Sequence, residues 1–220
     1  MGVNQMNEKF KNNFYYQLVI IFVGLPLFIW AAETLPSRTL LKESLSVLTI
    51  LAFSQMIGLF YMSRINESAV KMTRYSQLIK WHKGIGYSAV IILILHPFLL
   101  VLPRFFEAGI APLEALVTIL TTVNRQGVVL GLIAWCLLLT LGITSLVRKR
   151  LPISYKTWRV IHGILTMLLI VSAAWHAIDL GRHSSPAMSV FIVLLAAGGV
   201  LLLLKNYLPT KQQTGEIHEN

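Results

Sequence analysis

An apolar stretch runs from Trp81 to Pro103, WHKGIGYSAVIILILHPFLLVLP, and carries two histidines, His82 and His96. The two histidines are fourteen residues apart. Fourteen residues of α-helix come within about 40° of a whole number of turns and rise about 21 Å, so both side chains face one side of the helix. The stretch therefore predicts a helix that presents imidazoles at two levels.

A second stretch repeats this spacing. It runs from Trp158 to Asp179, WRVIHGILTMLLIVSAAWHAID, and its histidines, His162 and His176, are again fourteen residues apart. A single histidine in a membrane helix is usually a packing residue bonded to a neighbouring helix, but ionisable residues at bilayer depth often line functional interiors. Because two pairs share one spacing, we expect the two helices to hold two haems, one above the other, with one imidazole from each helix on each iron.

The cysteine content decides how the haems would be held. The chain has one cysteine, Cys136, and it does not belong to a CxxCH attachment motif. The expected haems are therefore b-type and non-covalent.

The composition predicts an integral membrane protein. Of the 220 residues, 55% are hydrophobic, and the mean hydropathy is +0.68. Six apolar runs are each close to the roughly 20 residues that cross the hydrocarbon core. They are Phe14 to Glu33, Leu45 to Met62, His82 to Leu102, Val128 to Val147, Val160 to Leu180 and Met188 to Leu204. We expect an all-α membrane protein, a six-helix transmembrane bundle at 14–204 that holds two stacked b haems, between cytoplasmic tails at 1–13 and 205–220.

The charge distribution gives the expected orientation. The net charge is +10, but the basic residues sit beside the spans, so they indicate contact with membrane lipid and not with nucleic acid. With the N-terminus inside, fourteen of the 19 Lys and Arg residues fall on the inner side and five on the outer side, namely Arg38, Lys42, Arg104, Arg125 and Arg182. The positive-inside rule then places both termini in the cytoplasm of a multi-pass protein. We expect a plasma membrane of the bacterial (inner membrane) type.

Four further residues are candidates for haem contact. Arg159, one turn before His162, and Lys83 are placed for an inner propionate; a lipid headgroup is the alternative partner for such cations. Gly86 leaves room for a flat macrocycle, although a small residue also permits close helix contact. Leu169 lies midway between the two levels of its helix. No residue is expected to be catalytic.

Other segments give weaker predictions. Gly24 and Pro26 predict a kink in the first span, and Pro97 predicts a bend next to His96. The connection around Leu113 to Leu120 has helical spacing and predicts an interfacial helix. His183 is expected in a loop outside the lipid and His218 in a polar tail.

Several motifs resemble one family. Six spans, paired histidines in the third and fifth, HKGIGY and HP in the third, and YKTWRVIH before the fifth are similar to the ferric reductase-like transmembrane domain family. Its relatives include ferric reductases, NADPH oxidases and the haem subunit of the periplasmic methionine sulfoxide reductase system. The resemblance implies that His82 and His162 ligate an inner haem, and that His96 and His176 ligate an outer one.

The resemblance also implies a function and its partners. Oxidase and reductase members carry a cytoplasmic flavin and nicotinamide domain after the sixth span, whereas 16 residues follow Leu204 here, without a GxGxxG sequence. We therefore expect a b-type cytochrome subunit of a transmembrane oxidoreductase. Its electrons would come from a separate cytoplasmic flavoprotein, with FAD or FMN on that partner, or from quinol, and would leave to an extracytoplasmic acceptor.

Two alternatives stay open from the sequence. A quinol-linked dihaem cytochrome b also pairs histidines at similar spacing on two helices. A non-redox metal-binding or transport protein would instead use soft or carboxylate co-ligands beside the histidines. The two stretches contain no cysteine and only Asp179 as a carboxylate near the rim.

Overall fold

The computed structural model describes residues 14–63 and 66–207, and every regular element within these ranges is a helix. The predicted tail at 1–13 and residues 208–220 of the predicted tail at 205–220, including His218, lie outside the described residues. The elements are η1 (Ile20–Gly24), α2 (Leu25–Ala31), α3 (Leu40–Tyr61), α4 (Glu67–Met72), α5 (Tyr75–Ala108), α6 (Pro112–Thr121), α7 (Gln126–Leu146), η2 (Arg148–Arg150), α8 (Tyr155–Leu180) and α9 (Pro186–Tyr207).

Six helical segments are long and apolar enough to cross a membrane, so the chain is a multi-pass membrane protein. They are Phe14–Ala31, Leu40–Tyr61, Tyr75–Ala108, Gln126–Leu146, Tyr155–Leu180 and Pro186–Lys205. Each contains most of one predicted span. The third segment, Tyr75–Ala108, is much longer than the predicted apolar run from His82 to Leu102. Residues 75–81 and 103–108, which include polar and charged side chains, continue the helix at both ends.

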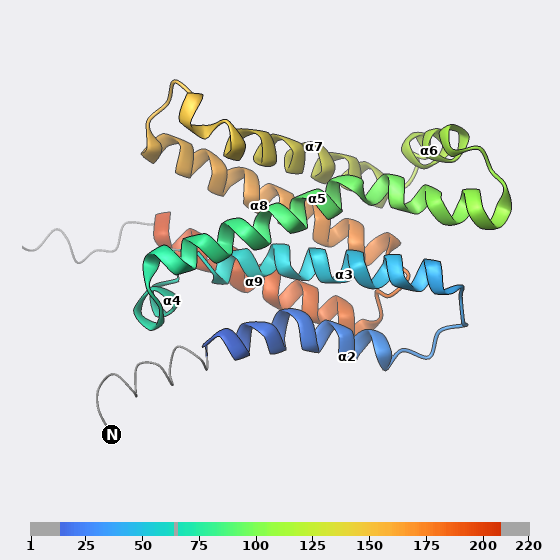
Figure 1. The fold of residues 1–220 in the computed structure, drawn as a ribbon, viewed down its shortest axis with the longest axis horizontal. Coiled ribbons are helices and arrows are strands. Elements are labelled where there is room, and N and C mark those ends of the chain that lie inside the picture. Colours follow the sequence, from blue (N-terminus) through green and yellow to red (C-terminus); the bar gives the residue numbers. More distant parts are fainter. Residues whose placement is uncertain (1–13, 64–65, 208–220) are drawn as a thin grey trace, which may run out of the picture.

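The long helices run side by side in an elongated bundle (Figure 1). α7 packs extensively on α8, and α3 packs extensively on α5. α6 lies against α5 at one end of the bundle, and α4 lies at the other end. Within the described residues, α5 and α8 make almost no close backbone contact with each other. The two helices that carry the paired histidines are therefore separated by a gap that α3 and α7 flank.

Apolar side chains cover both the inside and the outside of the bundle. Ile57 and Ile170 are fully buried in the central cluster. Leu201, Val171 and Ile91 are more than half exposed on the outer surface, as expected for side chains that face lipid. Packing in lipid depends on close contact at small residues, and Gly58 provides one example, because the Phe22 ring lies directly over it.

The first span is irregular at the predicted place. η1 is a π-helical turn in which Leu25 N–H donates to the carbonyl of Ile20, five residues earlier. Pro26, which has no N–H, follows at the start of α2. The irregularity expected at Gly24 and Pro26 is thus a π-helical turn.

α5 continues as one helix through Pro97 and Pro103 and is bowed along its length (Figure 1). The carbonyl of Ile94, next to the one that Pro97 leaves unpaired, accepts a hydrogen bond from Trp135 Nε1 of α7 at 3.0 Å. This bond ties α7 to α5 one turn before Pro97.

Polar contacts fasten the end of the bundle that carries α6. Glu107 of α5 contacts Lys42 and Thr39 at the start of α3. His183 lies in the turn between α8 and α9, as predicted for a loop residue, but only 8% of it is exposed. Its Nδ1 is 2.8 Å from Glu33 Oε2, and its Nε2 is 3.3 Å from Glu43 Oε2. His183 thus connects the turn to the ends of α2 and α3.

Candidate cofactor site

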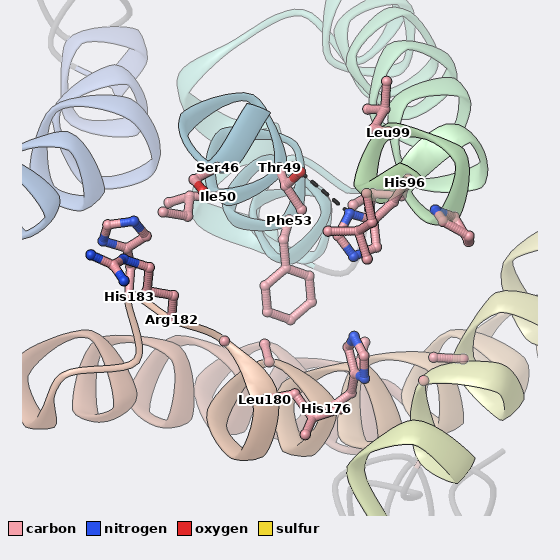
Figure 2. Close-up of a pocket in the computed structure, with 18 of the residues that line it drawn as sticks. Ser46, Thr49, Ile50, Phe53, His96, Leu99, His176, Leu180, Arg182 and His183 are labelled. Carbon is pink, nitrogen blue, oxygen red and sulfur yellow. Dashed lines mark hydrogen bonds between the residues drawn. The ribbon is translucent and has the colours of Figure 1, made fainter. Parts of the chain in front are cut away.

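His96 of α5 and His176 of α8 face each other across the gap between their helices (Figure 2). Their ring centres are 6.4 Å apart, and the ring planes make an angle of 82°. Both side chains are half-buried. The structure therefore brings together the two histidines that belong to the second level of each helix.

Both imidazoles of this pair are oriented through Nδ1. His176 Nδ1 lies 2.7 Å from the carbonyl oxygen of Gly127, and a carbonyl can only accept, so Nδ1 carries the hydrogen. The Thr49 hydroxyl donates to the Leu45 carbonyl at 2.9 Å, so its oxygen accepts the longer contact from His96 Nδ1 at 3.4 Å. This arrangement leaves Nε2 of each ring with its lone pair available, as in metal-bound histidines.

The start of α7 forms a close-fitting wall behind His176. Gly127, on the first turn, donates its N–H to Asp179 Oδ2 at 3.1 Å, and this bond satisfies one of the unpaired donors at a helix N-terminus. A Cβ atom on Gly131 would overlap the His176 ring, coming within 2.7 Å of Cε1. Glycine at 131 therefore lets α7 approach the imidazole closely.

A cavity of about 750 Å³ extends from the His96 and His176 rings to the end of the bundle that carries α6. Four cationic residues line it: Arg38, Lys42, Arg104 and Arg182. Arg182 donates from Nη2 to the Pro36 carbonyl, whereas its Nε is buried and has no hydrogen-bond partner within residues 14–63 and 66–207. Ile119 and Leu120 of α6 also line the cavity. α6 is thus a helix, as predicted, and it covers one wall of this space.

The residues of this level fit a bis-histidine haem. Two imidazole nitrogens on opposite sides of one metal ion, each bonded at about 2 Å as in zinc-bound histidine, put the ring centres about 6 Å apart, close to the separation found here. The cavity volume lies in the range of roughly 300–1,000 Å³ that organic ligands occupy. The cations at the α6 end of the cavity are opposite in sign to two propionates, and Lys42 among them is already paired with Glu107.

The other two histidines form a second level. His82 of α5 and His162 of α8 lie fourteen residues before His96 and His176 on the same two helices. Nδ1 of each ring is buried and has no partner in hydrogen-bond geometry among the described residues, although the backbone of Leu59 and Met62 lies near the His82 ring. A buried polar atom without a partner is rare in native proteins. Both rings therefore fit a site where a bound group completes the surroundings.

The four other predicted contact residues lie at different depths. Arg159 is half-buried, with its guanidinium carbon 5.9 Å from the centre of the Tyr155 ring. Lys83 is exposed. Gly86 is half-buried, and a Cβ atom there would make ordinary contact with Leu59 at 3.5 Å. Leu169 is 4% exposed and lines the cavity. Their roles in haem contact stay predictions.

Sequence reasoning did not single out several residues around the outer pair. Thr49 was one of several polar residues in an apolar run, and only the fold shows which one reaches His96. Gly127 acts through a backbone carbonyl, which leaves no signal in a sequence. Arg182 was assigned to the outer side by charge counting, and its position in the cavity follows from the turn after α8.

These features define a class of protein, a helical multi-pass membrane protein in which α5 and α8 carry histidines at two levels and in which His96 and His176 face each other inside the bundle. The family model described as ferric reductase like transmembrane component matches residues 48–173. This match covers more than half of the chain, and the chain belongs to that family, as the sequence motifs predicted. The matched segment contains His82, His96 and His162 and ends shortly before His176. Membership of this family indicates a membrane redox subunit.

One relative extends over more of the chain. A protein of Archaeoglobus fulgidus, described as uncharacterized, is 42% identical over 160 residues, which are 73% of this chain and 87% of the relative. No solved structure matches the chain. The comparisons therefore support the family and identify neither an electron donor nor an electron acceptor.

The close approach of α7 gives a first prediction. Gly131→Ala should destabilise the protein by about 1–3 kcal/mol, the usual cost of overpacking, because the added methyl overlaps the His176 ring. Gly84→Ala is the matched control, because a Cβ atom there meets nothing within 4 Å. Thermal unfolding in detergent should show a lower Tm for Gly131→Ala only. Equal Tm values for both variants would contradict the packing described here.

Proposed function

We propose that the chain is a b-type cytochrome subunit that moves electrons from a cytoplasmic flavoprotein to an acceptor on the other side of the membrane. The observation that carries the proposal is the facing pair His96 and His176, with each Nδ1 occupied and each Nε2 available. The second pair, His82 and His162, lies about 21 Å from the first along the same two helices. Two histidine levels on one pair of helices suit electron transfer across a bilayer better than a reaction at a single site.

When bound, two non-covalent haems would supply one-electron transfer, and the protein would hold, orient and enclose them. His96 and His176 would hold the outer haem, and His82 and His162 the inner one. Because two imidazoles would hold each haem, the protein would pass electrons to and from its partners without binding a substrate at the iron.

The surrounding residues support this assignment through their charges and their hydrogen bonds. At the outer level, Arg182 and Arg38 would bind the carboxylates, and α6 would exclude lipid and water from the cavity. At the inner level, Arg159 and Lys83 would take the same role. Gly127 and Thr49 keep the outer imidazoles in one tautomer, and such second-shell bonds raise the basicity of the ligand. A more basic ligand favours the oxidised metal.

The proposed direction is outward. Cations are concentrated on the side that carries η2 and the start of α8, and the positive-inside rule makes this the cytoplasmic side. With the inside negative, the free energy falls by about 2.3 kcal/mol per 100 mV for each electron that moves outward. The membrane potential therefore favours export of electrons to an outer acceptor.

A protein that only binds or transports metal ions is the rival from another class. Within residues 14–63 and 66–207, no group of three or more His, Cys, Asp or Glu side chains is placed to hold an ion. The described residues thus offer this rival no polydentate site, whereas the facing imidazoles of His96 and His176 suit an iron with a macrocycle around it.

A haem assay tests the proposal. Protein purified from cells supplied with haem should give a pyridine haemochrome of the b type with two haems per chain, and the oxidised protein should be low-spin by electron paramagnetic resonance. One haem per chain would restrict the proposal to a single level. Protein without haem, in a preparation that unfolds cooperatively, would refute it.

A further inference from the structure

Three aromatic rings are stacked along one face of α8 and lead to His162. They belong to Tyr155, Trp158 and His162, which are three and four residues apart and therefore neighbours on a helix surface. The ring centres of Tyr155 and Trp158 are 6.1 Å apart with an interplanar angle of 16°, and those of Trp158 and His162 are 4.8 Å apart with an angle of 30°. Both separations are typical of stacked aromatic pairs, roughly 4.5–7 Å.

Arg148 holds this stack in place from outside α8. It belongs to η2, and its guanidinium carbon lies 4.5 Å from the centre of the Tyr155 ring and 5.4 Å from that of Trp158. Cations within about 6 Å of an aromatic face are attracted to it. Arg148 therefore fixes both rings relative to the turn between α7 and α8. The stack thus has a defined geometry at Tyr155, the ring farthest from His162.

The stack connects the surface to the interior. Tyr155 is 47% exposed, whereas Trp158 and His162 are half-buried. Lys149, Arg150 and Lys156 are exposed around Tyr155. A surface of this charge attracts an acidic partner and steers its approach. An electron donor that docks here would place its redox group against the first ring.

We propose that Tyr155 and Trp158 form the electron input of the protein. An acidic flavoprotein would dock on Tyr155 and its surrounding cations, and electrons would tunnel through the two rings to the haem that His162 ligates. In each step the donor flavin loses one electron and one ferric iron becomes ferrous, and no bond of this chain forms or breaks. The inference rests on the proposed function and identifies where its donor acts.

Electron injection from a fixed position tests the path without the natural donor. A ruthenium tris-bipyridine photoreductant is attached through Lys156→Cys, beside the stack, or through Lys80→Cys on α5, near His82, both in a Cys136→Ser background. Laser flashes then give the rate of haem reduction from each position. Trp158→Leu should slow injection from the Lys156→Cys label by about tenfold or more, whereas Trp158→Phe, which keeps an aromatic ring, should restore most of the rate.

Separate measurements distinguish a path from a structural role. Haem content, midpoint potentials and the injection rate from the Lys80→Cys label should stay the same in Trp158→Leu. Trp81→Leu, which removes an exposed ring beside His82, is the matched control and should not slow injection from the Lys156→Cys label. Equal rates for Trp158→Leu and the parent, with both haems present, would overturn the path alone. Absence of haem in the parent would overturn the proposed function as well.

Discussion

His176→Ala and His96→Ala are each expected to remove the same haem and to leave one haem per chain. The reason is that the proposed outer iron needs both imidazoles, and the two rings face each other at 6.4 Å. His82→Ala and His162→Ala should likewise remove the other haem. Redox titration followed by visible absorption would show which of two centres is lost in each variant.

His183→Gln is the matched control for this set. His183 lines the same cavity, and glutamine keeps a donor for Glu33, so both haems should stay bound. Loss of one common centre in His82→Ala and His96→Ala, which lie on the same helix, would contradict pairing by depth.

The second prediction concerns the electron donor. NADPH or NADH alone should not reduce the purified haems, because the described residues form only helices and offer no parallel sheet of the kind that binds dinucleotides. Addition of a flavin reductase should allow reduction. Raising the salt concentration from 0.1 M to 1 M shortens the Debye length from about 10 Å to about 3 Å, so reduction by an acidic donor should become slower.

Charge reversal on the surface around η2 completes this test. Lys149→Glu with Arg150→Glu should slow reduction by the flavin reductase by about tenfold or more at low salt, the size of a steering effect. Arg125→Glu, next to the start of α7 at the other end of the bundle, is the matched control. Rapid reduction by NADH without added protein would refute the need for a separate donor. Reduction by membrane quinol with no salt dependence would support the quinol-linked alternative.

The main features of the fold could be predicted because they depend on patterns within single segments. Apolar length gave six spans, and the spacing of fourteen residues indicated that His82 and His96 share one helix face. The ends of α5 could not be found in this way, because residues 75–81 and 103–108 mix polar and charged side chains with apolar ones and fall outside a hydropathy run. In a sequence, a polar helix end can be recognised only by its capping residues, and the start of α5 has no side-chain cap.

The surroundings of the histidines depend on contacts between distant segments. The acceptor for His176 is a carbonyl of Gly127, 49 residues earlier in the chain, and no side-chain pattern marks such a bond. His183 stands in a polar turn, which suggests exposure, but Glu33 and Glu43 approach it from the ends of α2 and α3 and enclose it. Only the packing of the bundle places these groups together.

Electron transfer across a sealed bilayer tests the central claim most directly. The protein is reconstituted into vesicles that contain dithionite, external reductant is removed, and ferricyanide, which does not cross the membrane, is added outside. Wild-type vesicles should reduce external ferricyanide, and vesicles with His96→Ala or His82→Ala should reduce it no faster than vesicles without protein. Wild-type protein that carries haem but transfers no electrons, or equal transfer by the histidine variants, would contradict the proposed electron relay.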